Sequence, residues 1–314
     1  MVKLQCMVSR ENPIFGRKVF FINPPSVVEE HIIGRLKEHN FEVYSIKNYT
    51  YAKPLLRHYN DALCFAFIDN GMSIECWFNY IQSFQYEDDL KTIFLGVLSF
   101  TARPDVQQNF LMNLKLPGGF VIIDKDIKKT AATIEGILEI NGAKGRRQYL
   151  RLNLNDNNEV NGDFTQSTLL YSFRLIDISK VGFAAIIPAS MASNFKPDSF
   201  VHNISITMGR YSFVCTIKVH SVKTSGKSII MVAFFSDNIK EATKQKIHEY
   251  IYETLDKEHK HFMTTLVRDN ADYGISQIPV SEQEQKNAEK TIEELDEAVE
   301  EAMNSILKES GSKS

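Results

Sequence analysis

The segment that most constrains the fold is a continuous apolar run at residues 62–68, ALCFAFI. An uninterrupted apolar run of this length is typical of a β-strand that is buried on both faces. Comparable runs recur on either side of it, and amphipathic helical patterns separate them. In residues 27–39, for example, Val28, Ile32 and Leu36 are spaced as on one face of a helix. Strands that alternate with helices predict a doubly wound parallel sheet.

The first part of the chain accommodates five such strands. The predicted strands are residues 18–22, 41–46, 62–68, 92–98 and 120–123, and the predicted helices include 27–39, 104–114 and 128–140. We therefore expect a five-stranded α/β domain at residues 1–140.

The character of the sequence changes at Asn141-Gly142, where a helix can end, and Gly145 adds backbone freedom just beyond it. Short strand-like runs then follow one another, at residues 149–154, 168–178, 182–187, 200–208, 211–222 and 227–235. Loops are predicted at 155–163 and 223–226, and a helix at 239–255 or somewhat longer. Successive short strands with turn-rich loops predict an antiparallel barrel or sandwich. We expect this β domain to occupy residues 141–265.

The remaining residues, 266–314, are predicted to be a linker and an acidic C-terminal helix. Apolar residues in 281–308 recur at spacings of 4, 3, 4, 3 and 4, at Ala288, Ile292, Leu295, Val299, Ala302 and Ile306. This is a coiled-coil-like seam of only about three heptads. Residues 281–314 carry ten acids and four lysines. Two interpretations remain open: a helix that forms a homodimer or binds a partner, or a helix that packs on its own domain or frays.

Composition excludes several classes of protein. The net charge of −3 gives no strong overall attraction to nucleic acid or anionic membranes, so we expect no DNA or RNA partner. The N-terminus lacks an apolar stretch of signal length, and no run of about 18 apolar residues occurs, which predicts a cytoplasmic protein without a membrane span. The four cysteines form no CxxC pair, and the eight histidines are scattered. We therefore expect reduced thiols, no metal site and no catalytic set.

The segment at residues 144–151, KGRRQYLR, is the most informative for function. Half of its residues are basic, and Arg147 and Arg151 are spaced RxxxR directly after the glycine-containing joint. In an extended or turning segment, two guanidinium groups at this spacing can converge on one anion. Arginine suits phosphate because its donors bind bidentately and its flat face stacks on bases. A basic surface turn without a ligand explains the segment equally well when it is taken alone.

A second segment, residues 177–182 (DISKVG), has side chains suited to reading a base. The carboxylate of Asp177 can accept from two adjacent N–H donors, as on the edge of guanine, and the Ser179 hydroxyl can both donate and accept. Gly182 allows a tight turn between strands where a ligand approaches. The alternative is an ordinary hairpin with an Asx or Ser turn, which is the simpler explanation of this segment alone.

In this order and on a β-rich domain, the two segments resemble the PilZ family. Arg147, Arg151, Asp177, Ser179 and Gly182 each match the family pattern of RxxxR followed by D/NxSxxG. The resemblance covers roughly residues 143–260. It implies a six-stranded β-barrel that binds cyclic di-GMP without any further cofactor. The polar stretch at 155–167 departs from the family pattern and is interpreted as a loop insertion.

The resemblance also implies a role for each residue of the motif. The two arginines hold phosphate and guanine, Asp177 and Ser179 contact the base, and Gly182 preserves the turn. Arg146 lies beside Arg147 and adds charge to the same site.

The first domain resembles a response-regulator receiver domain in the order of its elements. A working receiver holds Mg²⁺ with acids after its first strand, but this chain has Asn23-Pro24 there. Asp69 follows the third strand, Ser99 or Thr101 follows the fourth, and Lys125 follows the fifth. We therefore expect a pseudo-receiver, in which Asp69 caps a strand end and the domain offers a docking surface.

These patterns predict a non-enzymatic cyclic di-GMP receptor. Repulsion among Lys144, Arg146, Arg147 and Arg151 would keep residues 141–151 mobile, and the anionic ligand would order them. Because this lead-in is also the interdomain joint, binding would reorient the domains and signal to an unidentified protein partner. The alternatives are a regulator phosphorylated on Asp69, and a structural adaptor that binds no nucleotide.

Overall fold

The computed structural model describes residues 16–154, 160–166, 169–225, 228–236 and 239–272. The predicted acidic helix at 281–308 and the N-terminal residues lie outside this range. The chain divides into two compact units, Met1–Gln148 with Lys260–Ser314, and Tyr149–His259. Each unit is described by itself.

The first unit contains a five-stranded parallel sheet in the order β2-β1-β3-β4-β5. The strands are β1 Val19–Ile22, β2 Val43–Ile46, β3 Leu63–Phe67, β4 Phe94–Ser99 and β5 Phe120–Ile122. All five predicted strands are present. The predicted central run forms β3, and each of its residues is buried, as expected for a strand covered on both faces.

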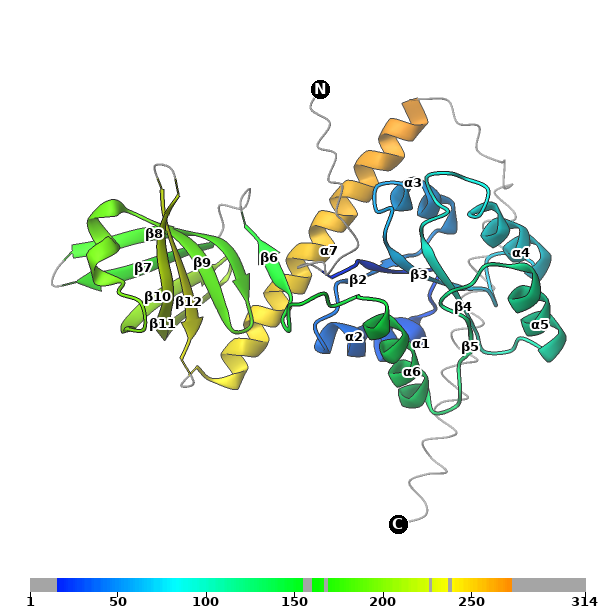
Figure 1. Ribbon diagram of the computed structural model, residues 1–314, viewed down its shortest axis with the longest axis horizontal. Coiled ribbons are helices and arrows are strands. Elements are labelled where there is room, and N and C mark those ends of the chain that lie inside the picture. The colour runs from blue at the N-terminus through cyan, green and yellow to red at the C-terminus, as the bar shows by residue number, and fades with distance from the viewer. Residues whose placement is uncertain (1–15, 155–159, 167–168, 226–227, 237–238, 273–314) are drawn as a thin grey trace, which may run out of the picture. The chain divides into compact units, whose positions relative to one another are not determined.

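Helices cover both faces of this sheet (Figure 1). The first crossover runs without a break through α1 Ser26–Val28, a π-helical turn Glu29–Ile33 and α2 Gly34–Glu38. The others are a 3₁₀ turn Tyr49–Tyr51 with α3 Ala52–Leu56, α4 Ile74–Ser83, α5 Pro104–Asn113 and α6 Ile127–Ile140. Apolar side chains of the first crossover and of α6 pack on one face of the sheet with Phe21 and Phe65. The doubly wound fold expected from the sequence is confirmed.

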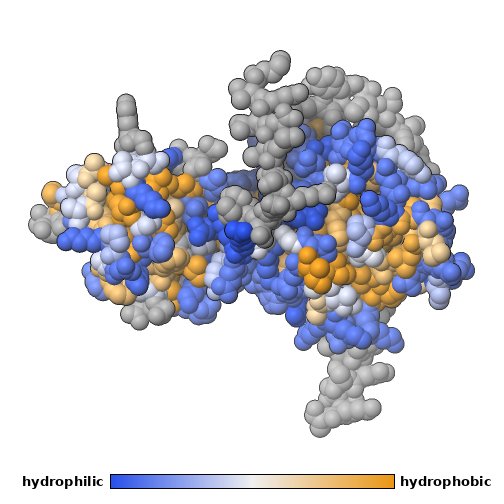
Figure 2. Space-filling view, viewed as in Figure 1, coloured by the Kyte–Doolittle hydropathy of each residue, from blue (hydrophilic) through white to orange (hydrophobic). Residues whose placement is uncertain are grey.

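Figure 2 shows where hydrophobic side chains reach the surface of the described residues. In the first unit, Leu111 and Met112 on α5 and Ile122 on β5 are exposed, and apolar surface gathers over β4 and β5. This apolar surface lies beside β5, an edge strand of the sheet. It is a surface at which another polypeptide can pack.

The second unit contains seven antiparallel strands in the order β6-β8-β7-β10-β11-β12-β9, and β8 also pairs with β9. The strands are β6 Arg151–Asn153, β7 Val160–Gln166, β8 Leu169–Ser179, β9 Gly182–Ile187, β10 Phe200–Met208, β11 Tyr211–Ser225 and β12 Ser228–Phe235. The pairing of β8 with β9 closes a ring of six strands, β7 to β12. The predicted six-stranded barrel is confirmed.

The strands that form this ring differ from the six strands that were predicted. Residues 160–166, expected to be loop, form β7, and the predicted first strand β6 lies on the edge of β8 beside the ring. The prediction failed because residues 155–167 are rich in polar and turn-forming residues. Val160 and Gly162 nevertheless point inward, and a Cβ on Gly162 would lie 2.2 Å from the Phe173 ring. The glycine is therefore required by the core rather than by a turn.

The helix predicted at 239–255 or somewhat longer is α7, Glu241–Asp272. Ile247, Tyr250 and Ile251 pack against the barrel core. The helix continues past His259, where the second unit ends, and in the first unit the Phe262 ring lies 5.2 Å from that of His58. A short 3₁₀ helix, Ala189–Asn194, connects β9 to β10. Among the described helices, none is long and apolar enough to cross a membrane.

Candidate ligand-binding site

Backbone pairing brings the second predicted motif and one arginine of the first motif together on the barrel. In the register of β6 and β8, Arg151 pairs with Ser179 and Asn153 pairs with Asp177. Ser179 also pairs with Gly182, so that β8 and β9 are joined by a two-residue turn at Lys180-Val181. The site thus consists of the start of β6, the end of β8 and the start of β9.

Arg151 and Asp177 form a loose ion pair on the outer face of the barrel. The Arg151 Nη1 atom lies 3.5 Å from each oxygen of the Asp177 carboxylate. The side chains are 30% and 24% exposed. A separation of 3.5 Å is at the outer limit of a hydrogen bond, so neither group is committed to the other. The remaining guanidinium donors and carboxylate lone pairs are suited to an incoming ligand.

Ser179 has a structural role that the sequence motif does not reveal. Its side chain is only 1% exposed, and its hydroxyl donates to the Gly182 carbonyl oxygen at 3.0 Å. This bond ties the two strands together across the turn, as in the simpler hairpin interpretation. The hydroxyl proton is committed to the backbone, so an interaction with a ligand would use the oxygen as an acceptor.

Gly182 is restrained by a neighbouring strand. A Cβ at this position would lie 2.3 Å from the carbonyl oxygen of Ala233 on β12. The turn itself is formed by Lys180 and Val181. The prediction that a glycine is needed for the turn therefore gives the wrong reason: it is needed because β9 and β12 approach closely. Phe234, the register partner of Gly182 on β12, is a residue of this neighbourhood that the sequence patterns missed.

The other two predicted arginines lie in the irregular segment between α6 and β6. Arg146 is exposed and Arg147 is half-buried. Both belong to the first unit, which ends at Gln148, whereas Arg151 belongs to the second. The structure of the barrel therefore brings Arg151, Asp177, Ser179 and Gly182 together without Arg146 and Arg147.

The beginning of the lead-in is fixed to the first unit. Ala143 is only 3% exposed, and the Arg17 amide donates to the Gly142 carbonyl oxygen at 3.2 Å. The Lys144 ammonium group donates to Glu139 at 2.8 Å and lies 3.9 Å from Glu135.

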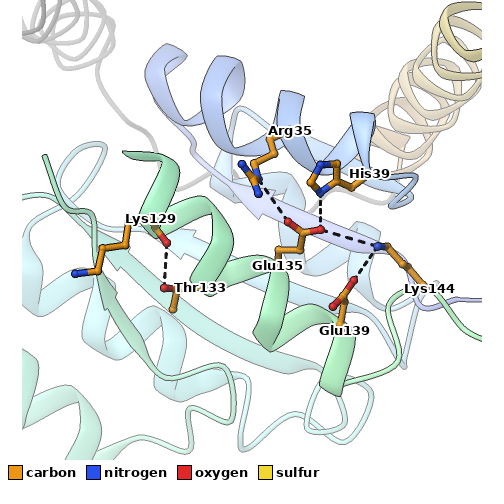
Figure 3. A network of polar contacts seen from close by, with 7 residues as sticks. All are labelled: Arg35, His39, Lys129, Thr133, Glu135, Glu139 and Lys144. Carbon is orange, nitrogen blue, oxygen red and sulfur yellow. Dashed lines mark hydrogen bonds and ion pairs between the residues drawn. The ribbon is translucent and has the colours of Figure 1, made fainter. Parts of the chain in front are cut away.

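Arg35 of α2 and His39, which follows the end of that helix, also reach the Glu135 carboxylate (Figure 3). Their distances to its oxygens are 3.4 and 2.5 Å. The charge of Lys144 is therefore compensated within the first unit. This differs from the expectation that Lys144 adds to repulsion within the lead-in, because the acidic partners come from α6 and could not be paired with it from the sequence. Beyond Lys144, the Gly145 amide donates to the Gly142 carbonyl oxygen at 3.3 Å.

Asp69 occupies the end of β3, where a phosphorylated aspartate would lie in a working receiver. One carboxylate oxygen accepts from the Ser99 hydroxyl at 2.5 Å, and the other accepts from the Phe100 amide at 2.6 Å. The carboxylate thus joins the ends of β3 and β4, which is the capping role expected from the sequence. At the position of the missing acids, the side-chain amide group of Asn23 donates to the carbonyl oxygen of Asn70 at 3.1 Å.

Metal and thiol chemistry find little support in the described part of the chain. No group of three or more His, Cys, Asp or Glu residues there is arranged to hold a metal ion. Cys64 and Cys215 are buried free thiols, and burial raises the pKa of Cys215 to about 12. Cys76 is exposed.

Comparison with known proteins gives similarities at the level of solved structures. No family model matches the chain, and no curated protein matches it. YcgR from Escherichia coli in complex with c-di-GMP is 17% identical, over 39% of this chain and 51% of that chain, with a TM-score of 0.33. The PilZ domain of the same protein with c-di-GMP is 19% identical, over 40% of this chain and 98% of that domain, with a TM-score of 0.31.

A response regulator from Thermotoga maritima is 17% identical, over 40% of this chain and 99% of that chain, with a TM-score of 0.34. The chain thus spans about half of the YcgR chain and nearly all of the other two. These proteins belong to the two groups that the sequence patterns resemble.

Proposed function

We propose that this protein is a non-enzymatic, cytoplasmic receptor for cyclic di-GMP. The observation that supports the proposal best is the cluster of Arg151, Asp177, Ser179 and Gly182 at three adjacent strand ends of a six-stranded barrel. The spacing that suggested a nucleotide site in the sequence corresponds to a compact group in the fold. The Arg151–Asp177 pair offers a cation for phosphate beside an acceptor for guanine.

In the proposed complex, the Arg151 guanidinium contacts a phosphate or stacks on a guanine base. The Asp177 carboxylate accepts from the two N–H groups on the edge of guanine. Arg147, with Arg146 beside it, reaches the ligand from the lead-in. Each charge-assisted hydrogen bond contributes about 1.5–3 kcal/mol.

Calorimetric titration with cyclic di-GMP tests the proposed site. We expect saturable binding to the wild type, and at least about 100-fold weaker binding when Arg147 and Arg151 are both replaced by alanine, because two charge-assisted contacts are lost. A matched control replaces Arg210 and Lys257, which are exposed basic residues of the barrel unit, by alanine. It changes net charge equally and should retain affinity. Undiminished binding by the Arg147/Arg151 variant would refute the site.

We further propose that binding orders residues 145–150 and thereby reorients the two units. The anchoring of Ala143 and Lys144 to the first unit gives this segment one fixed end, and β6 gives it the other. A doubly anionic ligand that joins Arg147 to Arg151 would shorten the connection between these ends. The result is a shift between two populations that ligand affinity can drive.

Distance measurements between spin labels test the reorientation. Cys76 is exposed whereas Cys64 and Cys215 are buried, so labelling of a Cys6→Ser, Ser212→Cys variant places one label on each unit. We expect the distance distribution to change on saturation with cyclic di-GMP, and not in the Arg147/Arg151 variant. The same distribution with and without ligand would rule the mechanism out.

The proposal includes a protein partner that the first unit recognises. Leu111 and Met112 on α5 and Ile122 on β5 are exposed apolar side chains of this unit. Phosphorylation of Asp69 is the less supported alternative, because its two carboxylate oxygens already bond Ser99 and Phe100. Incubation with acetyl phosphate should therefore leave the protein unmodified.

A further inference from the structure

The proposed ligand site continues into a row of side chains on the outer face of the barrel. Register pairs connect the strands in sequence from β6 through β8, β9, β12 and β11 to β10. Side chains of paired residues lie on the same face of a sheet. The members of this outer row are Arg151, Ser179, Gly182, Phe234, Lys218 and Phe200.

Phe234 lies on the outer face, next to Gly182 in this row. Its chain neighbours Ala233 and Phe235 are buried in the barrel core, whereas Phe234 is 38% exposed. Gly182 adds no side chain to the outer face between Ser179 and Phe234, and its backbone lies directly against that of β12. Two strand spacings, about 10 Å, separate β8 from β12. A planar base that lies over these strands can have Asp177 on one side and the Phe234 ring on the other.

A second ring supports Phe234. The strand β11 has an irregularity between Val219 and Ser221, so that His220 has no register partner in its pairing with β12. The imidazole is exposed, and its centroid lies 5.3 Å from that of the Phe234 ring. This contact restricts the rotamers of Phe234 and orients its ring before a ligand arrives.

We propose that Phe234, oriented by His220, is a stacking platform for a guanine base of the bound cyclic dinucleotide. This inference rests on the proposed function and extends it by one recognition element. Every base has a flat π-face, so stacking on Phe234 contributes affinity without distinguishing one base from another. Asp177 identifies the base through the N–H groups on its edge.

Calorimetric titration with cyclic di-GMP tests the platform with two substitutions of Phe234. Phe234→Leu keeps apolar volume without an aromatic face, and Phe234→Tyr keeps the face. We expect a roughly 5- to 150-fold increase in Kd for Phe234→Leu, the range for loss of one stacked base, and an increase below about threefold for Phe234→Tyr. Phe200→Ala is the matched control, because Phe200 is 57% exposed and belongs to the same outer row.

Three outcomes of this titration would overturn the stacking platform. Binding by Phe234→Leu with the affinity of the wild type, while the Arg147/Arg151 variant binds weakly, overturns the stacking platform and leaves the proposed function standing. Equal losses in Phe234→Leu and Phe200→Ala also overturn it, because the effect is then not local. Absence of binding by the wild type overturns both proposals.

Discussion

At Gly182 the backbone of β9 passes so close to Ala233 that no side chain fits between the two strands. A sequence motif identifies the glycine but not this reason, which depends on a strand some 50 residues later in the chain. The same holds for Ser179, whose hydroxyl bonds the Gly182 carbonyl oxygen, and for Lys144, whose acidic partners lie on α6. Residue types could thus be predicted from the sequence, whereas their contacts required the fold.

Substitution of Gly182 by alanine should destabilise the barrel unit by about 1–3 kcal/mol, because the new Cβ overlaps the backbone of β12. Gly136→Ala is a matched control, since nothing lies within 4 Å of a Cβ at that position of α6. Helix propensity predicts that it stabilises the first unit by about 0.5–1 kcal/mol. Differential scanning calorimetry of both variants measures these changes. A Gly182→Ala protein as stable as the wild type would contradict the close approach.

Among the elements, the continuous apolar strands were predictable and β7 was not. A strand that is buried on both faces, such as β3, has no polar residues. This pattern can be recognised in the sequence without knowing which strands lie beside it. Strand β7 is polar on its outer side, and one of its inward positions is Gly162. Its pattern becomes recognisable only when Phe173 of β8 is placed over that glycine. Local composition therefore predicted a loop, whereas pairing with β8 makes this segment a strand.

Glu87 joins two elements of the first unit in a way that depends on pH. Its carboxylate accepts from Lys53 and, at 2.6 Å, from Arg57, both of which belong to the segment around α3. Partial burial raises the pKa of Glu87, but the hydrogen bond and charge of Lys53, together with Arg57, outweigh it and lower the pKa below 4.5. A lowered pKa in the folded state means that the stabilisation is complete above the ordinary pKa and is lost as pH falls through the lowered one.

Replacing Glu87 by glutamine should therefore lower the melting temperature of the first unit at pH 7. The expected loss is about 1 kcal/mol or less, because the carboxylate is partly exposed. The difference from the wild type should shrink as pH is lowered below about 4.5, the ordinary value. Thermal unfolding followed by circular dichroism across this range measures it. A difference that stays constant with pH would show that the ion pairs are not its cause.

On the scale of the whole molecule, the chain passes between the two units twice. The first passage is the lead-in at Gln148-Tyr149, and the second lies within α7 at His259-Lys260. The order of an α/β domain and a barrel could be predicted because hydrophobic periodicity changes at residue 141. The second passage could not, because nothing in the pattern of the predicted helix marks where one unit gives way to the other. Any reorientation driven by the lead-in has to be accommodated in α7 as well.

The central claim is that the barrel binds cyclic di-GMP at the ends of β6, β8 and β9. Backbone amide NMR of the wild-type chain titrated with cyclic di-GMP tests in one experiment whether the ligand binds and where it binds. We predict saturable shifts at the amides of Arg151, Asp177, Ser179 and Gly182, and unchanged signals at Asp69 and Ser99. Saturable shifts confined to the region of Asp69, or no shifts at any ligand concentration, would contradict the claim.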